Sequence, residues 1–168
     1  MELLIPGLIL VALMVYASTK IKKSAAEAFE AEQIETDDFS ISKPEGLLSR
    51  VDPKPPFIFE AYSKALGEKP FENIRQVTAE IRTLQNTDVT NATNAVKNEV
   101  ETVTSEKSLN DGYLIEADEV RDEAATKGFY KIVRSNGDVF SLHISALKEP
   151  SDENLRKIEE MLDTFAVK

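Results

Sequence analysis

The sequence predicts an α+β protein: an N-terminal transmembrane helix followed by an antiparallel sheet that lies between helices. Three observations predict this class. Residues 3–19 form an uncharged, largely apolar run. Segments 129–135 and 138–145 flank an Asn-Gly pair, which is the strongest short signal for a β-hairpin. The C-terminal segment carries apolar side chains at helical spacing. The length of 168 residues fits one modest domain with an additional segment.

The run 3–19 is predicted to be a membrane anchor. A helix of its 17 residues reaches about 25 Å, close to the roughly 30 Å hydrocarbon core, and lysine stems after the run can extend the span. A buried core helix is the alternative, because the run is shorter than a usual span. The predicted anchor residues are Leu3, Leu4, Ile5, Leu8, Ile9, Leu10, Val11, Leu13, Met14, Val15 and Tyr16.

The charges beside this run predict its orientation. Lys20, Lys22 and Lys23 follow the run, whereas a secretory signal carries its basic residues before the apolar segment. The positive-inside rule therefore places the amino terminus outside and the rest of the chain in the cytoplasm. Export of the chain, or the reverse orientation, is the alternative. Residues 1–23 carry one acidic and three basic side chains, hence +2, and residues 24–168 carry 29 and 17, hence −12.

The chain is predicted to have three parts: anchor and basic flank 1–23, helical stalk 24–37 and folded domain 38–168. The stalk is predicted because its sequence is rich in alanine and glutamate, which are strong helix formers. In the domain, alternation predicts a short strand at 39–42, and aromatic and β-branched side chains predict another at 57–62.

The middle of the domain contains a segment whose pattern fits both a helix and a strand, followed by a predicted helix. Residues 73–84 fit both a helix face and an alternating strand, and the periodicity alone favours the helix. Thr87 or Asp88 can cap a helix that extends to Glu101 or slightly beyond. The apolar stripe of that helix is Val89, Ala92, Val96, Val100 and Val103.

The C-terminal half provides the clearest patterns. A strand is expected from Tyr113, before the hairpin, and the Asn-Gly turn sets a register in which Val133 lies opposite Phe140 and Tyr130 opposite His143. Both hairpin faces are partly apolar, so the sheet requires cover on both sides. Ser151 is expected to cap a closing helix, whose apolar stripe is Leu155, Ile158, Leu162 and Phe165.

The composition excludes several kinds of chemistry. Without cysteine there is no disulfide, thiol nucleophile, thiolate metal site or lipidated cysteine, and one histidine cannot form a multi-histidine zinc site. Net charge of −10 disfavours nucleic acid as a partner. We expect no cofactor and no catalytic set, and interpret Tyr130 and His143 as a cross-strand packing pair. The densest acidic cluster is Glu116, Asp118, Glu119, Asp122 and Glu123, expected to be a solvated edge, with a hard metal ion as the alternative.

Two segments resemble the PsbP-like superfamily, which includes the nuclear-import factor that binds the Ran GTPase. Residues 39–46 are similar to the opening strand and Pro-Glu-Gly turn of that group, and residues 137–146, with a final helix ending in Thr164-Phe165, are similar to its closing elements. The resemblance implies that residues 73–84 form a strand paired with 57–62. It also implies a protein-binding or assembly role, because the superfamily has no shared catalytic residues.

These observations together predict a single-pass membrane protein with a non-catalytic binding or assembly domain of the PsbP-like kind. The expected partners are the membrane, through one N-terminal helix, and another protein. The alternatives are an exported domain of the same fold, or a metal-binding protein or enzyme that uses the acidic cluster of residues 116–123. The oligomeric state is left open by the sequence.

Overall fold

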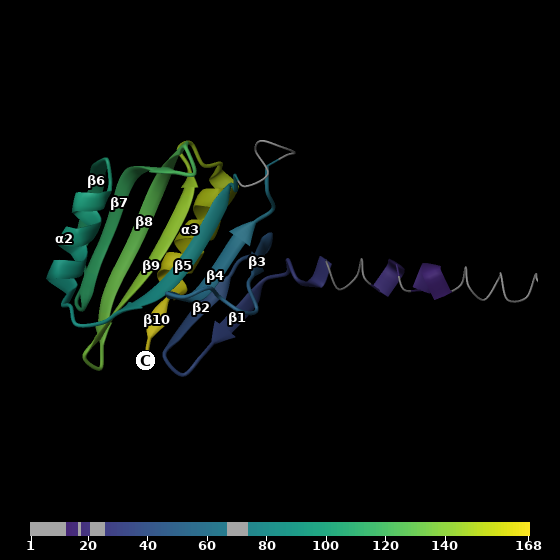
Figure 1. The fold of residues 1–168 in the computed structure, drawn as a ribbon, viewed down its shortest axis with the longest axis horizontal. Coiled ribbons are helices and arrows are strands. Elements are labelled where there is room, and N and C mark those ends of the chain that lie inside the picture. Colours follow the sequence, from purple (N-terminus) through teal and green to yellow (C-terminus); the bar gives the residue numbers. More distant parts are fainter. Residues whose placement is uncertain (1–12, 17, 21–25, 67–73) are drawn as a thin grey trace, which may run out of the picture. The chain divides into compact units, whose positions relative to one another are not determined.

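The computed structural model describes residues 13–16, 18–20, 26–66 and 74–168. The chain divides into two units, Met1–Glu30 and Ala31–Lys168. The second unit contains the elements seen in Figure 1. In chain order they are β1 (Glu32–Glu35), β2 (Phe39–Lys43), β3 (Leu47–Ser49), β4 (Phe57–Ser63), β5 (Val77–Leu84), α2 (Val89–Glu99), β6 (Thr102–Ser108), β7 (Gly112–Arg121), β8 (Ala124–Ser135), β9 (Asp138–Leu147), α3 (Asp152–Thr164) and β10 (Ala166–Val167).

Most of the predicted anchor, with Lys22 and Lys23, lies outside the described residues. Its described parts, 13–16 and 18–20, are helical. Leu13, Met14, Val15 and Tyr16 have 58–67% of their surface exposed. Within the described part of the chain, no helix combines the length and the apolar composition needed to cross a membrane.

A seven-stranded antiparallel sheet forms the centre of the second unit, in the order β3-β4-β5-β9-β8-β7-β6. The predicted hairpin register is confirmed, since Val133 pairs with Phe140 and Tyr130 with His143. Asn136 and Gly137 have φ of 51° and 93°, as a two-residue turn of the primed type requires. β5 is a strand paired with β4. The resemblance therefore predicted this segment correctly, and the helical periodicity was misleading.

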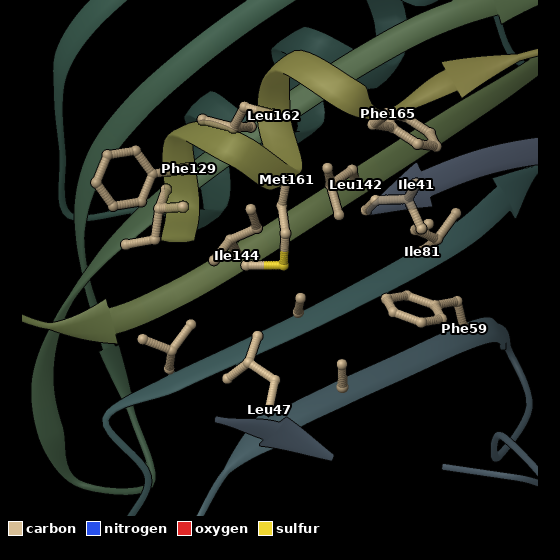
Figure 2. Packing of buried hydrophobic residues seen from close by; sticks show 14 of the residues in the cluster. Ile41, Leu47, Phe59, Ile81, Phe129, Leu142, Ile144, Met161, Leu162 and Phe165 are labelled. Atoms are coloured by element: carbon tan, nitrogen blue, oxygen red, sulfur yellow. The ribbon is translucent and has the colours of Figure 1, made fainter. Parts of the chain in front are cut away.

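The larger core lies between one face of this sheet and α3. Ser151 caps α3 as predicted, and its side chain accepts a hydrogen bond from the Asn154 amide. Figure 2 shows Met161 of α3 extending toward Ile144 of β9. A second, three-stranded sheet, β1-β2-β10, adds Phe39 and Ile41 to the same core. Burying this much apolar surface is the main force that holds α3 against the sheet.

The opposite face of the sheet carries a smaller core under α2. Asp88 caps α2, as the sequence predicts, and Ala92 and Val96 pack with Ile115, Ile132 and Val139. Figure 1 shows α2 at the β6–β7 end of the sheet, whereas α3 contacts β9 and β2. The prediction of cover on both faces is thus confirmed, but α2 packs mainly on β7 and β8.

The structure differs from the predicted elements in the stalk, at the end of the helix that begins at Asp88, and in three further strands. The stalk helix predicted for residues 24–37 is wrong at its end, because Glu32–Glu35 is strand β1, in which Ile34 pairs with Ile41 and packs against the larger core. Strand pairing and burial of Ile34 there outweigh local helix propensity. Val103, predicted on a helix stripe, lies in β6, where it still packs against the smaller core. Strands β3, β6 and β10 were not predicted.

Candidate functional site

The α2 side of β4, β5 and β9 carries charged and hydroxyl side chains where an apolar layer would be expected. Strand alternation places Val77, Ala79 and Ile81 in the larger core, so the residues between them face the other way. We call this surface the polar face. Its residues are Glu60, Tyr62, Thr78, Glu80, Arg82, Ser141, His143 and Ser145, together with Arg50, Arg75 and Arg121, which contact it.

His143 is at the centre of the polar face and lies between two carboxylates. Its Nε2 is 3.1 Å from Oε1 of Glu119 on β7, and its Nδ1 is 3.8 Å from Oε2 of Glu80 on β5. The ring stacks on Tyr130 of β8, with centroids 4.2 Å apart and planes 5° from parallel. The predicted packing pair is therefore confirmed, and the two carboxylates are an addition that the sequence analysis missed.

Glycine 128 leaves the space through which Glu119 reaches His143. Glu119 and His143 stand on β7 and β9, with β8 between them. A Cβ at Gly128 would lie 2.7 Å from Oε2 of Glu119 and 2.8 Å from Cε2 of Tyr130. The Tyr130 hydroxyl donates a hydrogen bond to Oε2 of Glu119. The absence of a side chain at Gly128 thus allows the carboxylate to lie over β8.

Arg121 extends the same network toward β5. Its guanidinium donates to both carboxylate oxygens of Glu80, to Oε2 over 3.3 Å. Such two-pronged contacts are the strongest and most directional of ion pairs. Arg121, Glu80, His143 and Glu119 therefore form a row of contacting side chains from β7, β5 and β9. Their charges alternate in sign along the row when His143 is protonated.

The two carboxylates of this network are held in the ionised form. Burial alone would raise the pKa of Glu119, but the hydrogen bond and charge of His143 and the hydrogen bond from Tyr130 lower it to about 2. Burial alone would also raise the pKa of Glu80, but the hydrogen bonds and charges of His143 and Arg121 lower it to about 2. A carboxylate that accepts several hydrogen bonds from charged donors is expected to resist protonation in this way.

The two aromatic members of the network, His143 and Tyr130, have raised pKa values. Burial disfavours the charged form of His143, but the adjacent Glu119 and Glu80 outweigh it and raise its pKa above the ordinary 6.5. Burial and the hydrogen bond to Glu119 raise the pKa of Tyr130, so its phenol stays neutral. The site therefore holds a fixed set of charges with a neutral phenol.

His143, the chain's single histidine, should make stability depend on pH. A group whose pKa is raised by folding stabilises the protein below its unfolded value, near 6.5, and ceases to do so as pH rises through its folded value. The groups facing it are Glu80, Glu119 and Tyr130, with Arg121 behind Glu80. We expect urea unfolding to show declining stability above pH 6.5, and the decline to be absent in His143→Gln.

Proton NMR of the single histidine gives an independent measurement of the same effect. Its ring signals should titrate with a pKa above 6.5, because both neighbouring carboxylates favour the imidazolium. A pKa below 6.5, or an unchanged decline in stability in His143→Gln, would contradict the ion-pair description.

The acidic cluster predicted between residues 116 and 123 is not a single group. Glu119 points into the polar face, whereas Glu116 pairs with Lys127 over 3.0 Å and Asp118 with Lys148 over 3.3 Å. Asp122 and Glu123 form the β7–β8 turn with positive φ. Among the described residues no group of histidine and acidic side chains is arranged to hold a metal ion. Alternation along β7 explains the division, since neighbouring residues face opposite sides.

Sequence patterns could have indicated part of this site. Tyr130 and His143 follow from the Asn-Gly register, but Glu80 becomes the neighbour of His143 only when β5 pairs with β9. Glu119 requires the pairing of β7 with β8 and the gap at Gly128. The sequence does contain one usable signal, since Glu80 and Glu119 each lie within a segment of strand-like alternation. In a sheet, such residues can come to lie beside the single histidine.

Four of the chain's six arginines, Arg50, Arg75, Arg82 and Arg121, belong to the polar face. Arg50 lies 3.4 Å from Glu60. Arg75 lies 4.2 Å above the ring of Tyr62, and its Nη1 donates to the Ser63 carbonyl over 2.6 Å. Arginine and tyrosine are enriched where proteins bind one another, so the polar face has the composition of an interface.

Known proteins resemble this chain in fold and not in sequence. No protein-family model and no curated protein matches the chain. The Ran-binding protein Mog1p of Saccharomyces cerevisiae superposes with a TM-score of 0.56 at 13% identity, over 83% of this chain and 96% of Mog1p. Cyanobacterial PsbP (CyanoP) of Synechocystis sp. PCC 6803 gives 0.54 at 8% identity, over 83% and 94%.

A third solved structure matches over a smaller share of its length. The chain spans 45% of a protein from Bacteroides thetaiotaomicron VPI-5482, with 77% of this chain covered, a TM-score of 0.47 and 13% identity. Together with the strand order, the likeness to Mog1p and PsbP shows a PsbP/Mog1-like α+β fold with antiparallel sheets. The predicted resemblance is confirmed for the fold.

Proposed function

We propose that this chain is a non-catalytic binding module, that it docks a protein partner on the polar face, and that its N-terminal segment attaches it to a membrane. The observation that carries the proposal is the polar face itself. It holds fixed charges and several arginines, and it lies on the same side of the sheet as α2, which packs on β7 and β8. The fold supports it, since one protein of this shape is described as Ran-binding.

The chemistry of the network supports binding over catalysis. A general acid or base works best with a pKa near the working pH, whereas Glu80 and Glu119 have pKa values of about 2 and Tyr130 stays neutral. His143 is already occupied by the two carboxylates. Ser141 and Ser145 flank it on β9 without donating to it among the described residues, so no activated nucleophile is assembled.

The proposed attachment has two supports. Residues 3–19 carry no charge and three lysines follow them within four positions. The described parts of the run, residues 13–16 and 18–19, are helical, and the apolar side chains of 13–16 are exposed. Such a surface is unfavourable in water and favourable in lipid. The three lysines favour a cytoplasmic location of the folded domain, by the positive-inside rule.

Isolation of the full chain from detergent-solubilised membranes tests the binding function. We expect a reproducible stoichiometric partner with the wild type, and loss of most of it with Arg50→Glu, which reverses a charge of the polar face. Arg134→Glu makes the same change at an exposed position on β8 and should retain the partner. Equal loss in both variants, or no partner under several solubilisation conditions, would contradict the proposal.

A topology experiment tests the attachment separately. A reporter fused after Lys168 should be active only on the cytoplasmic side, and the chain should stay in the membrane fraction after alkaline washing. Glutamate in place of Lys20, Lys22 and Lys23 should reverse or scramble the orientation, because it removes the positive flank. Release of the wild-type chain by the alkaline wash would refute the anchor, and activity on the far side would support export.

A further inference from the structure

A small hollow on the polar face lies between two arginines. Arg75, Thr78, Arg121 and Ser145 line it together with Asp122, and we call it the arginine hollow. Thr78 and Ser145 are register partners on β5 and β9, so their hydroxyl-bearing side chains stand next to each other on the same side of the sheet. A neighbouring hollow shares Arg75, Thr78, Arg121 and Asp122, so the depression continues toward Tyr62.

Both arginines are held in place by contacts that leave donors available. A guanidinium has five N–H donors. Within the described chain, Arg75 uses one of them on the Ser63 carbonyl, and its plane is supported by the Tyr62 ring. Arg121 donates to the two oxygens of Glu80. Anchoring reduces the entropy that the side chains lose when they bind a ligand.

A buried hydroxyl adds a second, independent indication of a ligand. Ser145 is 3% exposed, lines the arginine hollow and has no hydrogen-bond partner within bonding distance among the described residues. Hydrogen bonding of its hydroxyl toward the nearby Glu119 carboxylate is among the causes that lower the pKa of Glu119. A hydroxyl both donates and accepts, so Ser145 keeps the capacity to bond a polar group that enters the hollow.

Charge decides which ligand suits this position. The carboxylates of the polar face already have cationic partners: Glu60 has Arg50, Glu80 has Arg121, and Glu119 has His143. Arg75, in contrast, has no carboxylate partner among the described residues. An incoming carboxylate would meet two guanidinium groups and two hydroxyls, the donor set that planar acidic groups prefer, beside the one carboxylate of Asp122, which the two arginines outnumber.

We infer that the arginine hollow receives the carboxylate of an acidic side chain from the protein partner. This inference rests on the proposed binding function and adds the chemistry of the partner. Residues 24–168 have a net charge of −12, which repels acidic molecules in general. Recognition is therefore confined to a short acidic segment that reaches the four arginines, and it should weaken as salt rises.

NMR titration of the full chain in detergent micelles tests the inference with a capped Gly-Glu-Glu-Gly peptide. The amide signals of Thr78 and Arg121 should shift in a saturable manner, and the uncharged Gly-Gln-Gln-Gly peptide should leave them unchanged. Arg75→Gln should weaken binding by about fivefold or more, the effect of losing one charge-assisted contact. Arg134→Gln removes the same charge at an exposed position on β8 outside the polar face and should change affinity less than about twofold.

The remaining outcomes each decide against the inference. Equal weakening in both arginine variants would assign binding to general charge, and equally tight binding of inorganic phosphate would assign the hollow to free anions. Tighter binding of a Gly-Lys-Lys-Gly peptide would point to a basic partner. Retention of a membrane partner by both the wild type and Arg75→Gln would overturn this inference while the proposed function stands, whereas absence of any partner would remove the proposed function itself.

Discussion

Replacing Gly128 by alanine is expected to lower the free energy of unfolding by about 3 kcal/mol, the upper range for adding a methyl group to a packed site. The new Cβ would lie 2.7 Å from the Glu119 carboxylate and 2.8 Å from the Tyr130 ring, closer than carbon atoms come to either. Displacing Glu119 also removes the nearer of the two carboxylates beside the His143 imidazolium, which adds the cost of a weakened buried ion pair. Urea unfolding of the full chain at pH 6 measures this loss.

Two controls connect that loss with the Glu119 contact. Ala125→Ser changes an exposed position of the same strand and should cost less than about 0.5 kcal/mol. In a Glu119→Ala background, Gly128→Ala should cost less than half as much, because the closest colliding group is gone. The NMR pKa of His143 should also fall in Gly128→Ala. Additive costs and an unchanged histidine pKa would show that Gly128 serves another purpose.

Glu119→Gln is expected to destabilise the protein by about 3 kcal/mol at pH 6. One pKa unit corresponds to about 1.4 kcal/mol, so lowering the pKa of Glu119 from the ordinary 4.5 to about 2 gives this figure. The Glu119 side chain is only 10% exposed, so solvent screens the interaction little. Glutamine keeps the shape and some hydrogen bonding but leaves His143 beside Glu80 alone.

The pH dependence of this loss has a definite sign. A carboxylate whose pKa is lowered by folding stabilises the protein above its unfolded value, near 4.5, and stops doing so as pH falls toward about 2. The difference between wild type and Glu119→Gln should therefore shrink between pH 4.5 and pH 2. Glu116→Gln is the matched control, because its partly exposed pair with Lys127 should contribute less than about 0.5 kcal/mol. A difference that stays constant to pH 2, or equals the control, would disprove the assignment.

Local patterns in the sequence were sufficient for several parts of the fold. The Asn-Gly turn predicts the register of β8 and β9, and the caps Asp88 and Ser151 mark where α2 and α3 begin. These features depend on residues close in sequence, so the pattern contains the needed information. Strand β6 shows the limit, since its polar sequence forms a strand only because β7 offers a partner edge.

The candidate site illustrates what a local pattern cannot contain. Glu80, Glu119 and His143 come from strands β5, β7 and β9, and they meet because β5 and β8 both pair with β9 and β7 pairs with β8. Gly128, an ordinary glycine in the sequence, acquires its role from the carboxylate that lies over it. The dense acidic cluster was the stronger sequence signal, yet strand alternation sends its members to different surroundings.

By itself, the sequence determined the antiparallel hairpin, the two amphipathic helices, the absence of thiol chemistry and the contrast between the basic flank of Lys20, Lys22 and Lys23 and the acidic remainder of the chain. Those properties follow from side-chain chemistry and from spacing along the chain. Only the tertiary structure decided that strand 77–84 pairs with β9, that Glu119 is buried while Glu116 is not, and that four arginines gather on one face. The physical reason is that pairing between distant strands, not local propensity, sets which side chains share an environment.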